Sequence, residues 1–424
     1  MNLESLYQLF LECSSVSTDT RKIEEGDLFF ALKGENFNGN TYAKDALAKG
    51  AKYAVIDEEE FHTSDQTILV NDVLKTLQLL ANYHRNRLKT PIIALTGSNG
   101  KTTTKELINV VLSQKFSTTA TKGNLNNHIG VPLTLLSMSN TTEIGIIEMG
   151  ANHQKEIEFL CNIAEPDYGL ITNYGKAHLE GFGGVEGVIE GKSEMFVHLI
   201  QNNKTIFLNL KDPIQIEKSK GGHTFTFGSS DNNPEVAIDF IEAQPFVKGK
   251  YKNEIINSHL IGDYNFNNIA VAIAIGNYFK VEPYQIKTAI ENYIPSNNRS
   301  QIIEKNSNKI ILDAYNANPT SMRAALLNFD KQEGNKIAIL GDMFELGEEA
   351  EKEHQTIADL ASSLNINQVF LIGENFFKSE VNQDSVFQFE KFVEFKKVFE
   401  LEKINNSTLL IKGSRGMALE RILD

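Results

Sequence analysis

A glycine-rich segment, TGSNGKTTTK at residues 96–105, combines the residue types that bind phosphate. Gly97 and Gly100 allow the backbone to come close to phosphate oxygens. Lys101 can neutralise the β and γ groups of a nucleotide, and the Thr102 hydroxyl can ligate Mg²⁺. The segment lies between an apolar strand-like run and a helical pattern, which is the context that a phosphate-binding loop requires.

A glycine turn that merely ends a strand would explain the same residues without a ligand. A lysine at a helix start is disfavoured by the helix dipole unless an anion accompanies it, so nucleotide binding is the favoured interpretation. Leu95 stands where the usual eight-residue pattern has its first glycine, which makes this a shortened variant. The expected nucleotide contacts here are Gly97, Ser98, Asn99, Gly100, Lys101, Thr102 and Thr103.

Two further side chains follow strand-like runs. Glu148 ends IGIIEM (144–149), where a carboxylate is costly unless it is paired or bound to a metal. His178 follows the next run, YGLITN (168–173). Because ligands bind at the carboxyl ends of parallel strands, both side chains could lie beside the glycine-rich loop. Taken alone, a salt bridge for Glu148 and a capped turn for His178 explain them equally well.

The elements that must position these groups fall into three segments. Residues 1–88 mix short β-like runs with one helical stretch from Asp72 to about Lys89, which predicts a small α/β domain. Thr90-Pro91 marks its end, because the residue before proline is biased away from the helical conformation.

Residues 89–296 and 297–424 each alternate apolar strand-like runs with helical stretches, which predicts mainly parallel sheets with helices on their faces. Within the central segment, the apolar run 269–279 predicts a buried helix. A chain of 424 residues also has a prior of two or three domains. We therefore expect an α/β protein of three domains.

Bulk properties exclude several classes of protein. A formal net charge of −14 opposes sequence-independent nucleic-acid binding. The sequence has no signal-like N-terminus and no run of about 18 uncharged apolar residues, so neither secretion nor membrane insertion is indicated. Cys13 and Cys161 have neither CxxC nor zinc-ligand spacing, which is typical of buried thiols in a reducing compartment. We expect a cytoplasmic protein.

Four more segments carry a resemblance to a known family: 121–136, 146–153, 171–184 and 190–196. With the glycine-rich loop, their order and spacing closely resemble the Mur ligase family, which also includes folylpolyglutamate synthases. The resemblance covers nearly the whole chain and is weakest over about 210–258. It implies an N-terminal domain for a UDP substrate, a central ATPase domain, and a Rossmann-like C-terminal domain that swings closed.

Within that family, the C-terminal motifs at 311–326, 341–354 and 412–420 resemble those of members that add D-alanyl-D-alanine to UDP-N-acetylmuramoyl-tripeptide. The DNPR-like motif of the lysine- or diaminopimelate-adding members is not found in the sequence. The resemblance implies that ATP activates the tripeptide carboxylate as an acyl phosphate, which the dipeptide amine then attacks. We expect a monomer, and the third residue of the tripeptide, lysine or diaminopimelate, stays open.

The resemblance also implies two Mg²⁺ ions near the glycine-rich loop. Thr102, Glu148 and His178 would be ligands, and Lys192 matches a lysine that the family carries in carbamylated form. Carbamylation would turn an ammonium into an anion able to ligate the second Mg²⁺. An unmodified lysine touching phosphate, or a solvated one, is the alternative. The implied catalytic residues are Lys101, Glu148, His178 and Lys192.

For adenosine, the resemblance points to Asn268 at the base, Asp313 at the ribose and Arg299 at the phosphates. Asn268 could instead cap a helix, and Asp313 could simply end its strand. Tyr264 stands where the family often has histidine, and Asn38-Gly39-Asn40 stands where Asp-Gly-His is usual.

The remaining candidates bind the two substrates. Short polar groups in a glycine- and asparagine-rich loop suit a sugar-peptide, with turn formation as the alternative, and Arg415 could pair bidentately with the dipeptide carboxylate. The candidates for the UDP-linked substrate are Ser17, Thr18, Arg21, Thr121, Asn124 and Asn127. Those for the dipeptide and the closed state are Asn316, Asn318, Lys412, Ser414 and Arg415.

Three rival functions can be distinguished from this one. The first is another ligase of the same superfamily, adding one amino acid to a UDP-muramoyl peptide or glutamate to folate; the C-terminal motifs argue against it. The second is a P-loop NTPase without ligase activity, which would need neither the asparagine-rich loop nor the UDP-type domain. The third is an inactive nucleotide-binding module, against which Lys101, Glu148, His178 and Lys192 weigh.

Overall fold

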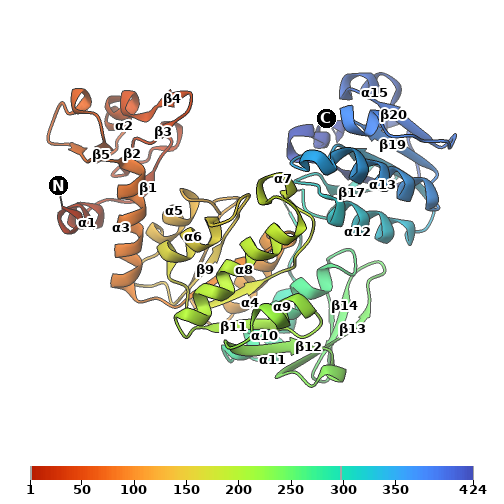
Figure 1. Ribbon diagram of the computed structural model, residues 1–424, viewed down its shortest axis with the longest axis horizontal. Helices are drawn as coiled ribbons and strands as arrows, with labels where there is room; N and C mark the ends of the chain where they lie inside the picture. Colours follow the sequence, from red (N-terminus) through yellow and green to blue (C-terminus); the bar gives the residue numbers. More distant parts are fainter. Residues whose placement is uncertain (1, 297, 424) are drawn as a thin grey trace.

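The computed structural model describes residues 2–296 and 298–423 and has three parts, each built around its own sheet (Figure 1). The first and third parts lie at opposite ends of the long axis, with the central part between and below them. The expected three-domain α/β architecture is therefore confirmed. Among the described residues, no helix is both long enough and apolar enough to cross a membrane.

The first part is a parallel four-stranded sheet in the order β1-β2-β5-β6 with a short hairpin, β3-β4. Its core residues, such as Phe30 and Val55, are fully buried. The elements are α1 (Leu3–Leu11), β1 (Val16–Ser17), β2 (Leu28–Phe30), β3 (Lys33–Gly34), β4 (Phe37–Asn38), α2 (Ala43–Ala48), β5 (Tyr53–Ile56) and β6 (Thr67–Leu69).

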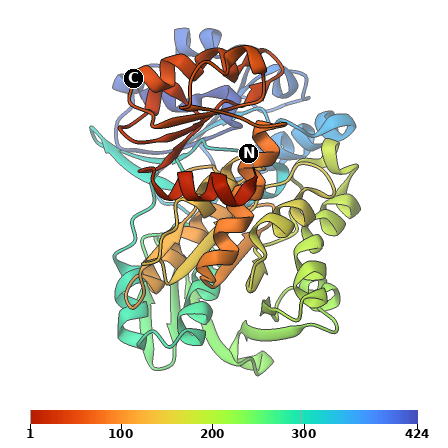
Figure 2. The ribbon, with the colours of Figure 1, turned by 90° about the vertical axis from the view of Figure 1, so that its left-hand side faces the viewer.

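Helix α3 (Val73–Leu88) joins this part to the next. It contacts α1 and β2 on one side and packs against two helices of the central part, α5 (Gly130–Leu136) and α6 (Glu156–Ala164), on the other. The view in Figure 2 shows α3 running down from the first sheet along the central part. The buried Arg85 side chain fixes this junction by donating to the Ala164 carbonyl at 3.0 Å.

The central part is a nine-stranded sheet in the order β15-β14-β13-β12-β11-β10-β7-β9-β8. Pairing is parallel from β8 to β13 and antiparallel from β13 to β15. Its strands are β7 (Ile92–Thr96), β8 (Thr118–Ala120), β9 (Ile144–Glu148), β10 (Tyr168–Ile171), β11 (Thr205–Asn209), β12 (His223–Gly228), β13 (Val236–Glu242), β14 (Lys248–Tyr251) and β15 (Glu254–Asn257).

Helices cover both faces of this sheet, as the apolar strands require. One face packs on α4 (Lys101–Leu112), α10 (Asn265–Tyr278) and α11 (Pro283–Glu291), and the other on α5, α6 and α8 (Val185–Gln201). The expected helix over 269–279 is observed as part of α10, which ends one residue earlier, at Tyr278, and is buried along almost its whole length. Two short helices, α7 (Leu179–Phe182) and α9 (Pro213–Lys218), complete the part.

The third part is a six-stranded sheet in the order β16-β17-β21-β18-β19-β20, parallel except for β16. Its strands are β16 (Gln301–Lys305), β17 (Asn308–Asp313), β18 (Asn335–Gly341), β19 (Gln368–Ile372), β20 (Val386–Phe389) and β21 (Ser407–Lys412). Its helices are α12 (Pro319–Asp330), α13 (Ala350–Ser363), α14 (Glu374–Phe377) and α15 (Phe392–Val398). Position 297, where this domain is expected to begin, lies outside the described residues.

Candidate active site

The glycine-rich loop connects β7 to α4, as the sequence predicts. Gly97 has φ +140°, and a Cβ there would lie 2.0 Å from the Thr172 hydroxyl oxygen, so only glycine fits. The segment after β10 holds the loop from the side: Ser98 donates from its backbone N–H to the Asn173 carbonyl at 3.0 Å and from its hydroxyl to the Gly175 carbonyl at 2.7 Å. These contacts fix the loop at the N-terminus of α4, which is where anions bind to helices.

Glu148 lies at the end of β9, almost completely buried, and both its carboxylate oxygens accept hydrogen bonds. Thr102 donates from its hydroxyl to one oxygen, and Asn126 donates from its amide to the other, each at 2.8 Å. The Glu148 backbone N–H donates to the Thr121 hydroxyl oxygen at 2.9 Å. The structure thus brings Thr102 and Glu148 together, and it uses Thr121 to position that carboxylate.

Lys101 opens helix α4 and turns back onto its own loop. Its ammonium donates to the Gly97 carbonyl at 2.7 Å. Loss of water around the ammonium lowers the pKa of Lys101, Glu148 partly opposes this, and Arg299 adds to it. A bound phosphate would supply the counter-charge that this group lacks.

A cavity of about 850 Å³ extends from the glycine-rich loop to the third part of the chain. It is lined by residues of the central and third parts together, so it is a site between domains. Of the candidates from the sequence, it takes in Ser98, Asn99, Gly100, Lys101, Thr102, Thr103, Asn124, Asn127, Glu148, His178, Asn268, Arg299, Asp313, Asn316, Asn318 and Lys412.

Asn268 lies inside α10 and does not cap it. Its side-chain oxygen accepts from the Thr104 hydroxyl at 3.0 Å, and its amide donates to the Asn265 side chain at 2.8 Å. Gly100, at φ +79°, lies directly beneath it, and a Cβ there would come within 2.7 Å of the Asn268 side-chain oxygen. Asn268 therefore borders the glycine-rich loop on the cavity side.

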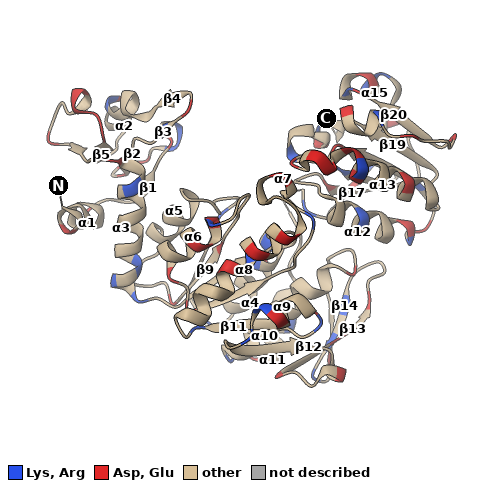
Figure 3. Ribbon diagram, viewed as in Figure 1, with Lys and Arg blue, Asp and Glu red and all other residues tan. Residues whose placement is uncertain are grey.

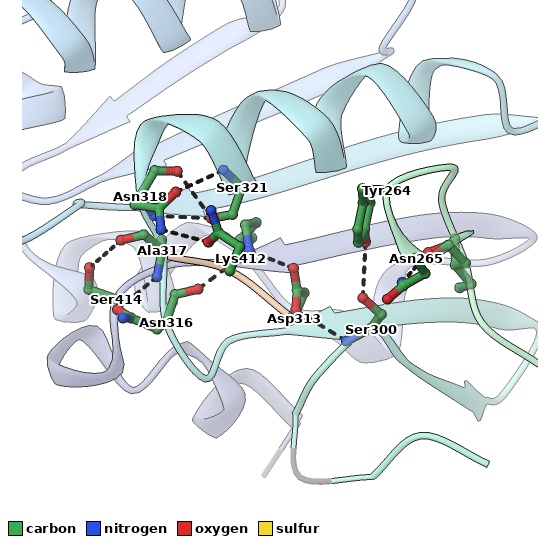
Figure 4. Close-up of polar contacts among 12 residues, drawn as sticks. Tyr264, Asn265, Ser300, Asp313, Asn316, Ala317, Asn318, Ser321, Lys412 and Ser414 are labelled. Atoms are coloured by element: carbon green, nitrogen blue, oxygen red, sulfur yellow. Dashed lines mark hydrogen bonds and ion pairs between the residues drawn. The ribbon is translucent and has the colours of Figure 1, made fainter. Parts of the chain in front are cut away.

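On the third part, a polar network surrounds the end of β17 (Figure 4). Asp313 accepts from the Ser300 backbone N–H at 3.1 Å and pairs with the buried Lys412 at 2.5 Å. Asp313 thus ends its strand and also faces the cavity. Arg299 stacks on the Tyr315 ring, with its guanidinium carbon 3.6 Å from the ring centre.

Asn318 links the third part to the glycine-rich loop. Its side-chain oxygen accepts from the Ser321 backbone N–H at 2.9 Å and so caps α12, which begins at Pro319. Its amide donates to the Asn99 side-chain oxygen at 2.7 Å. One side chain therefore closes a helix and touches the expected nucleotide loop across the domain boundary.

His178 follows β10 and α7 begins just after it. The His178 ring nitrogen Nδ1 lies 2.5 Å from a carboxylate oxygen of Glu345, which belongs to the third part. An N–H in the ring plane does not point straight at that oxygen, so the pair is a close polar contact rather than a well-directed hydrogen bond. Next to it, Lys176 forms an ion pair with Glu353 across the same boundary.

Lys192 lies on α8 and is completely buried. Its amine donates to the Ala151 carbonyl at 2.9 Å and lies 4.8 Å from the centre of the Phe182 ring. No carboxylate pairs with it among the described residues. Burial lowers the pKa of Lys192 well below its usual value, and repulsion from Lys101 adds to this shift. Lys192 itself does not line the cavity, although Ala151 does.

The other candidates lie away from the cavity. In the first part, the Ser17 hydroxyl donates to the Asp19 carbonyl at 3.2 Å. Arg21 is exposed and forms an ion pair with Asp19, and Thr18 is half-buried. In the third part, Ser414 accepts from the Phe344 backbone N–H at 2.9 Å. Arg415 is exposed and pairs with Glu420 at 2.5 Å.

The donor groups fit a magnesium ion that is held in part by a nucleotide. In the part of the chain that the structure describes, no three His, Cys, Asp or Glu side chains form a metal cluster. Mg²⁺ usually keeps several waters and takes one or two carboxylates together with substrate phosphates, so a complete protein cage is not expected. The hydrogen-bonded pair of Thr102 and Glu148, at the mouth of the glycine-rich loop, supplies such a partial site.

Sequence reasoning did not find four residues of this site: Asn126, Tyr315, Glu345 and Lys176. Asn126 lies between the candidates Asn124 and Asn127, so its position in the same asparagine-rich loop could have identified it as a site residue. Glu345 and its interdomain contact had no local signal, because the contact joins positions 167 residues apart only when the third part is docked.

Comparison with known protein families gives three matches in chain order. Residues 12–90 match "Mur ligase family, catalytic domain", residues 95–276 match "Mur ligase middle domain", and residues 298–415 match "Mur ligase, glutamate ligase domain". Together they span most of the chain.

Individual relatives match over nearly their whole length. The UDP-N-acetylmuramoyl-tripeptide–D-alanyl-D-alanine ligase of Bacillus subtilis is 35% identical, with 96% of this chain and 92% of the relative covered. The enzyme of the same name from Escherichia coli is 31% identical, with 96% and 92% covered.

Solved structures agree with these sequence matches. A crystal structure of MurF from Acinetobacter baumannii is similar with a TM-score of 0.86 at 28% identity, over 100% of this chain and 97% of that one. MurF from Thermotoga maritima in complex with ADP is similar with a TM-score of 0.82 at 26% identity, over 98% and 97%.

Proposed function

The chain belongs to the Mur ligase family, and we infer that it joins D-alanyl-D-alanine to UDP-N-acetylmuramoyl-tripeptide with consumption of ATP, as its named relatives do. It is an ATP-dependent peptide ligase of peptidoglycan synthesis. The product is the UDP-linked pentapeptide.

One observation in this structure carries the assignment beyond the family. The cavity of about 850 Å³ joins the glycine-rich loop to the polar network around Asp313 and Lys412 on the third part. A simple NTPase would need only the loop side. A cavity that is closed by a second domain suits a reaction in which a nucleotide and two further substrates must meet and water must be excluded.

We propose the following course of reaction. A carboxylate oxygen of the tripeptide attacks the γ-phosphorus of ATP, ADP leaves, and an acyl phosphate forms. The dipeptide amine attacks the acyl carbon, phosphate leaves, and the amine loses its proton. Lys101 and Arg299 line the cavity and would neutralise the phosphate oxygens during the first step. Bound Mg²⁺ would add charge neutralisation at the transferred group, held by Thr102, Glu148 and His178.

The adenosine and substrate contacts are part of the same proposal. Asn268 beneath the base, Asp313 at the ribose and Arg299 at the phosphates are supported by their place on the cavity. Asn124 and Asn127 would contact the sugar-peptide, and Asn316, Asn318 and Lys412 the dipeptide side, for the same reason. Ser17, Thr18 and Arg21 would bind the uridine end in the first domain, with Ser414 and Arg415 acting in the closed state.

We further propose that Lys192 reacts with CO₂ to form a carbamate, its amine nitrogen bonding to the carbon and releasing one proton. Its complete burial without a carboxylate partner supports this, because a neutral amine is the reactive form and burial lowers the pKa of Lys192. The carbamate would then serve a second Mg²⁺.

A ¹³C NMR experiment tests the carbamate. In ¹³C-bicarbonate we expect one slowly exchanging carbamate signal that Lys192→Arg removes. Lys105 is a matched control, since it is equally buried but pairs with Glu106 at 3.0 Å, so Lys105→Arg should leave the signal in place. A spectrum without a carbamate signal, or a signal retained in Lys192→Arg, would refute the modification.

The organisation of the chain is proposed as three domains, residues 1–88, 89–296 and 297–424, supported by the separate sheets and by the order of the family matches. We propose that the protein acts as a monomer. We place it in the cytoplasm, where the ATP that the reaction consumes is supplied.

The deciding experiment measures phosphate release from ATP by the purified full chain with Mg²⁺ and UDP-N-acetylmuramoyl-tripeptide, with and without D-alanyl-D-alanine, followed by mass analysis. We expect dipeptide-dependent release and the pentapeptide mass. Release that is indifferent to both substrates would favour an NTPase without ligase activity. Using tripeptides that end in lysine and in diaminopimelate would identify the third residue.

A further inference from the structure

The contact between His178 and Glu345 lies at the boundary between the central and third domains, and it is made by the ring nitrogen Nδ1 of His178. Nδ1 of His178 is buried, and Glu345 provides its only close polar atom among the hydrogen bonds and ion pairs of the described residues. His178 is also among the residues that line the cavity. Glu345 also accepts, through its carbonyl, from the Glu180 backbone N–H at 3.3 Å.

Both partners adopt a backbone conformation that is unfavourable for residues other than glycine. His178 has φ +55° and Glu345 has φ +61°, in the left-handed region. Such a conformation costs on the order of 1 kcal/mol or more and persists only where the surroundings impose it. Two strained residues that face each other across a domain boundary indicate a contact that the fold enforces from both sides.

The third domain holds the Glu345 loop through buried groups. The Met343 backbone N–H donates to Nε2 of His354 at 2.9 Å, and the Phe344 backbone N–H donates to the Ser414 hydroxyl oxygen at 2.9 Å. His354 is itself completely buried. The loop therefore presents Glu345 from a rigid support rather than from a free turn.

We propose that Glu345 is a positioning residue for His178: its carboxylate, 2.5 Å from Nδ1, favours the proton on that nitrogen and would so leave the Nε2 lone pair for a metal bound at the cavity. A histidine that ligates a metal commonly gives its other ring N–H to a carboxylate, which fixes the tautomer and the ring orientation. Since Glu345 comes from the third domain, the metal site is complete only when that domain is docked. This inference rests on the metal-binding role of His178 in the proposed function.

The chain supplies a matched control two residues away. Lys176 pairs with Glu353 of the third domain, and its backbone N–H donates to the Thr320 hydroxyl oxygen at 2.9 Å. These contacts hold the same two domains together without touching the His178 ring. Glu353→Gln therefore weakens docking but leaves the partner of Nδ1 in place.

The experiment measures Mn²⁺ binding by electron paramagnetic resonance in the full chain, with a non-hydrolysable ATP analogue present. We expect Glu345→Ala to weaken Mn²⁺ binding about ten-fold. Glu345→Gln should restore part of that loss, because its amide oxygen can still place partial negative charge beside Nδ1–H. Glu353→Gln should weaken Mn²⁺ binding clearly less than Glu345→Ala does, because the partner of Nδ1 is still present in it. Metal-free binding of the analogue should be the same in Glu345→Ala and in the unaltered protein.

Unaltered Mn²⁺ binding in Glu345→Ala would overturn the inference, and so would an equal loss in Glu353→Gln, which would reduce the contact to docking alone. His178→Ala separates this from the proposed function. If His178→Ala weakens Mn²⁺ binding and Glu345→Ala does not, only the inference fails. If His178→Ala has no effect either, the metal-binding role of His178 fails with it.

Discussion

At the scale of single residues, the site depends on buried charged groups that specific hydrogen-bond partners hold in position. Glu148 is the clearest case, because Thr102 and Asn126 each hold one carboxylate oxygen and Thr121 holds the backbone behind it. A buried carboxylate without such partners would be strongly destabilising. Glu148 is also among the residues that line the cavity, where a metal that carries phosphates would bind.

Glu148→Gln should reduce kcat at least about 100-fold, because one carboxylate oxygen becomes an amide that neither accepts from Thr102 nor ligates Mg²⁺. The rate is measured as pentapeptide formed at saturating substrates. Glu143→Gln is the control, since Glu143 is exposed and precedes the opposite end of β9, where it accepts from the Ser117 backbone N–H. Near-normal turnover in Glu148→Gln would remove this carboxylate from the mechanism.

At the scale of elements, helix ends and helix packing carry the site residues. The glycine-rich loop stands between β7 and α4, Lys192 is held inside α8, and Asn318 begins α12. Helix α3 ties the first domain to the central one by packing on α5 and α6. These helices therefore stabilise their own domains and also hold the site residues in place.

Asn318→Ala should cost about 1 kcal/mol of stability, because a helix cap is lost. It should also raise the KM for D-alanyl-D-alanine up to about ten-fold, because the hydrogen bond to Asn99 across the domains disappears. Asp212→Ala is the control: Asp212 caps α9 but makes no interdomain bond among the described contacts. Thermal unfolding measures the loss of stability in both variants, and steady-state kinetics measures KM for the dipeptide. Equal changes of KM in Asn318→Ala and Asp212→Ala would contradict the role of Asn318 in linking the two domains.

His84, on α3, gives a pH dependence of stability. Its Nε2–H donates to the Met138 carbonyl at 3.0 Å and its Nδ1 accepts from the Tyr7 hydroxyl at 3.2 Å, so the buried ring is neutral. Burial lowers the pKa of His84 below 6.5. The unfolded chain then binds more protons than the folded one below about pH 6.5, and stability falls as the pH decreases through that range.

His84→Gln should therefore flatten the decline in stability between about pH 6.5 and 5, by at most about 1.4 kcal/mol per pH unit for one proton. Glutamine can keep both hydrogen bonds, so the variant should fold. Thermal midpoints across this range, compared with those of the unaltered protein, give the difference in slope. Parallel curves for the two proteins would show that His84 does not titrate between the folded and unfolded states.

At the scale of the whole molecule, polar and charged contacts join the third domain to the rest around the cavity, beside an apolar cluster that both parts share. Ion pairs cross the boundary at Lys176–Glu353 and, at 3.6 Å, at Lys331–Asp263. The contact between His178 and Glu345 lies at the same boundary. Acidic and basic segments are interspersed over all three domains (Figure 3), so no domain carries the net charge alone. Contacts of this kind are individually weak and are screened by salt, which suits a domain that must move during turnover.

Raising NaCl from about 50 to about 500 mM should increase the radius of gyration of the substrate-free protein, because screening weakens these pairs. Small-angle X-ray scattering measures the change. Glu353→Gln should start from a larger radius at low salt and respond less. A radius that is independent of salt in both proteins would show that apolar packing, rather than charge, sets the domain arrangement.

The amino-acid sequence by itself determined the three α/β segments, the glycine-rich loop and, through motifs that resemble a known family, about half of the residues that line the cavity. Periodicity, glycine turns and short motifs are local signals. The tertiary structure decided which distant side chains contact one another, and local signals carry no information about such contacts. It placed Asn268 inside a helix rather than at its cap, it used Thr121 to hold Glu148, and it gave His178 its partner Glu345. These are contacts between distant segments, and they exist only once the sheets have packed and the domains have docked.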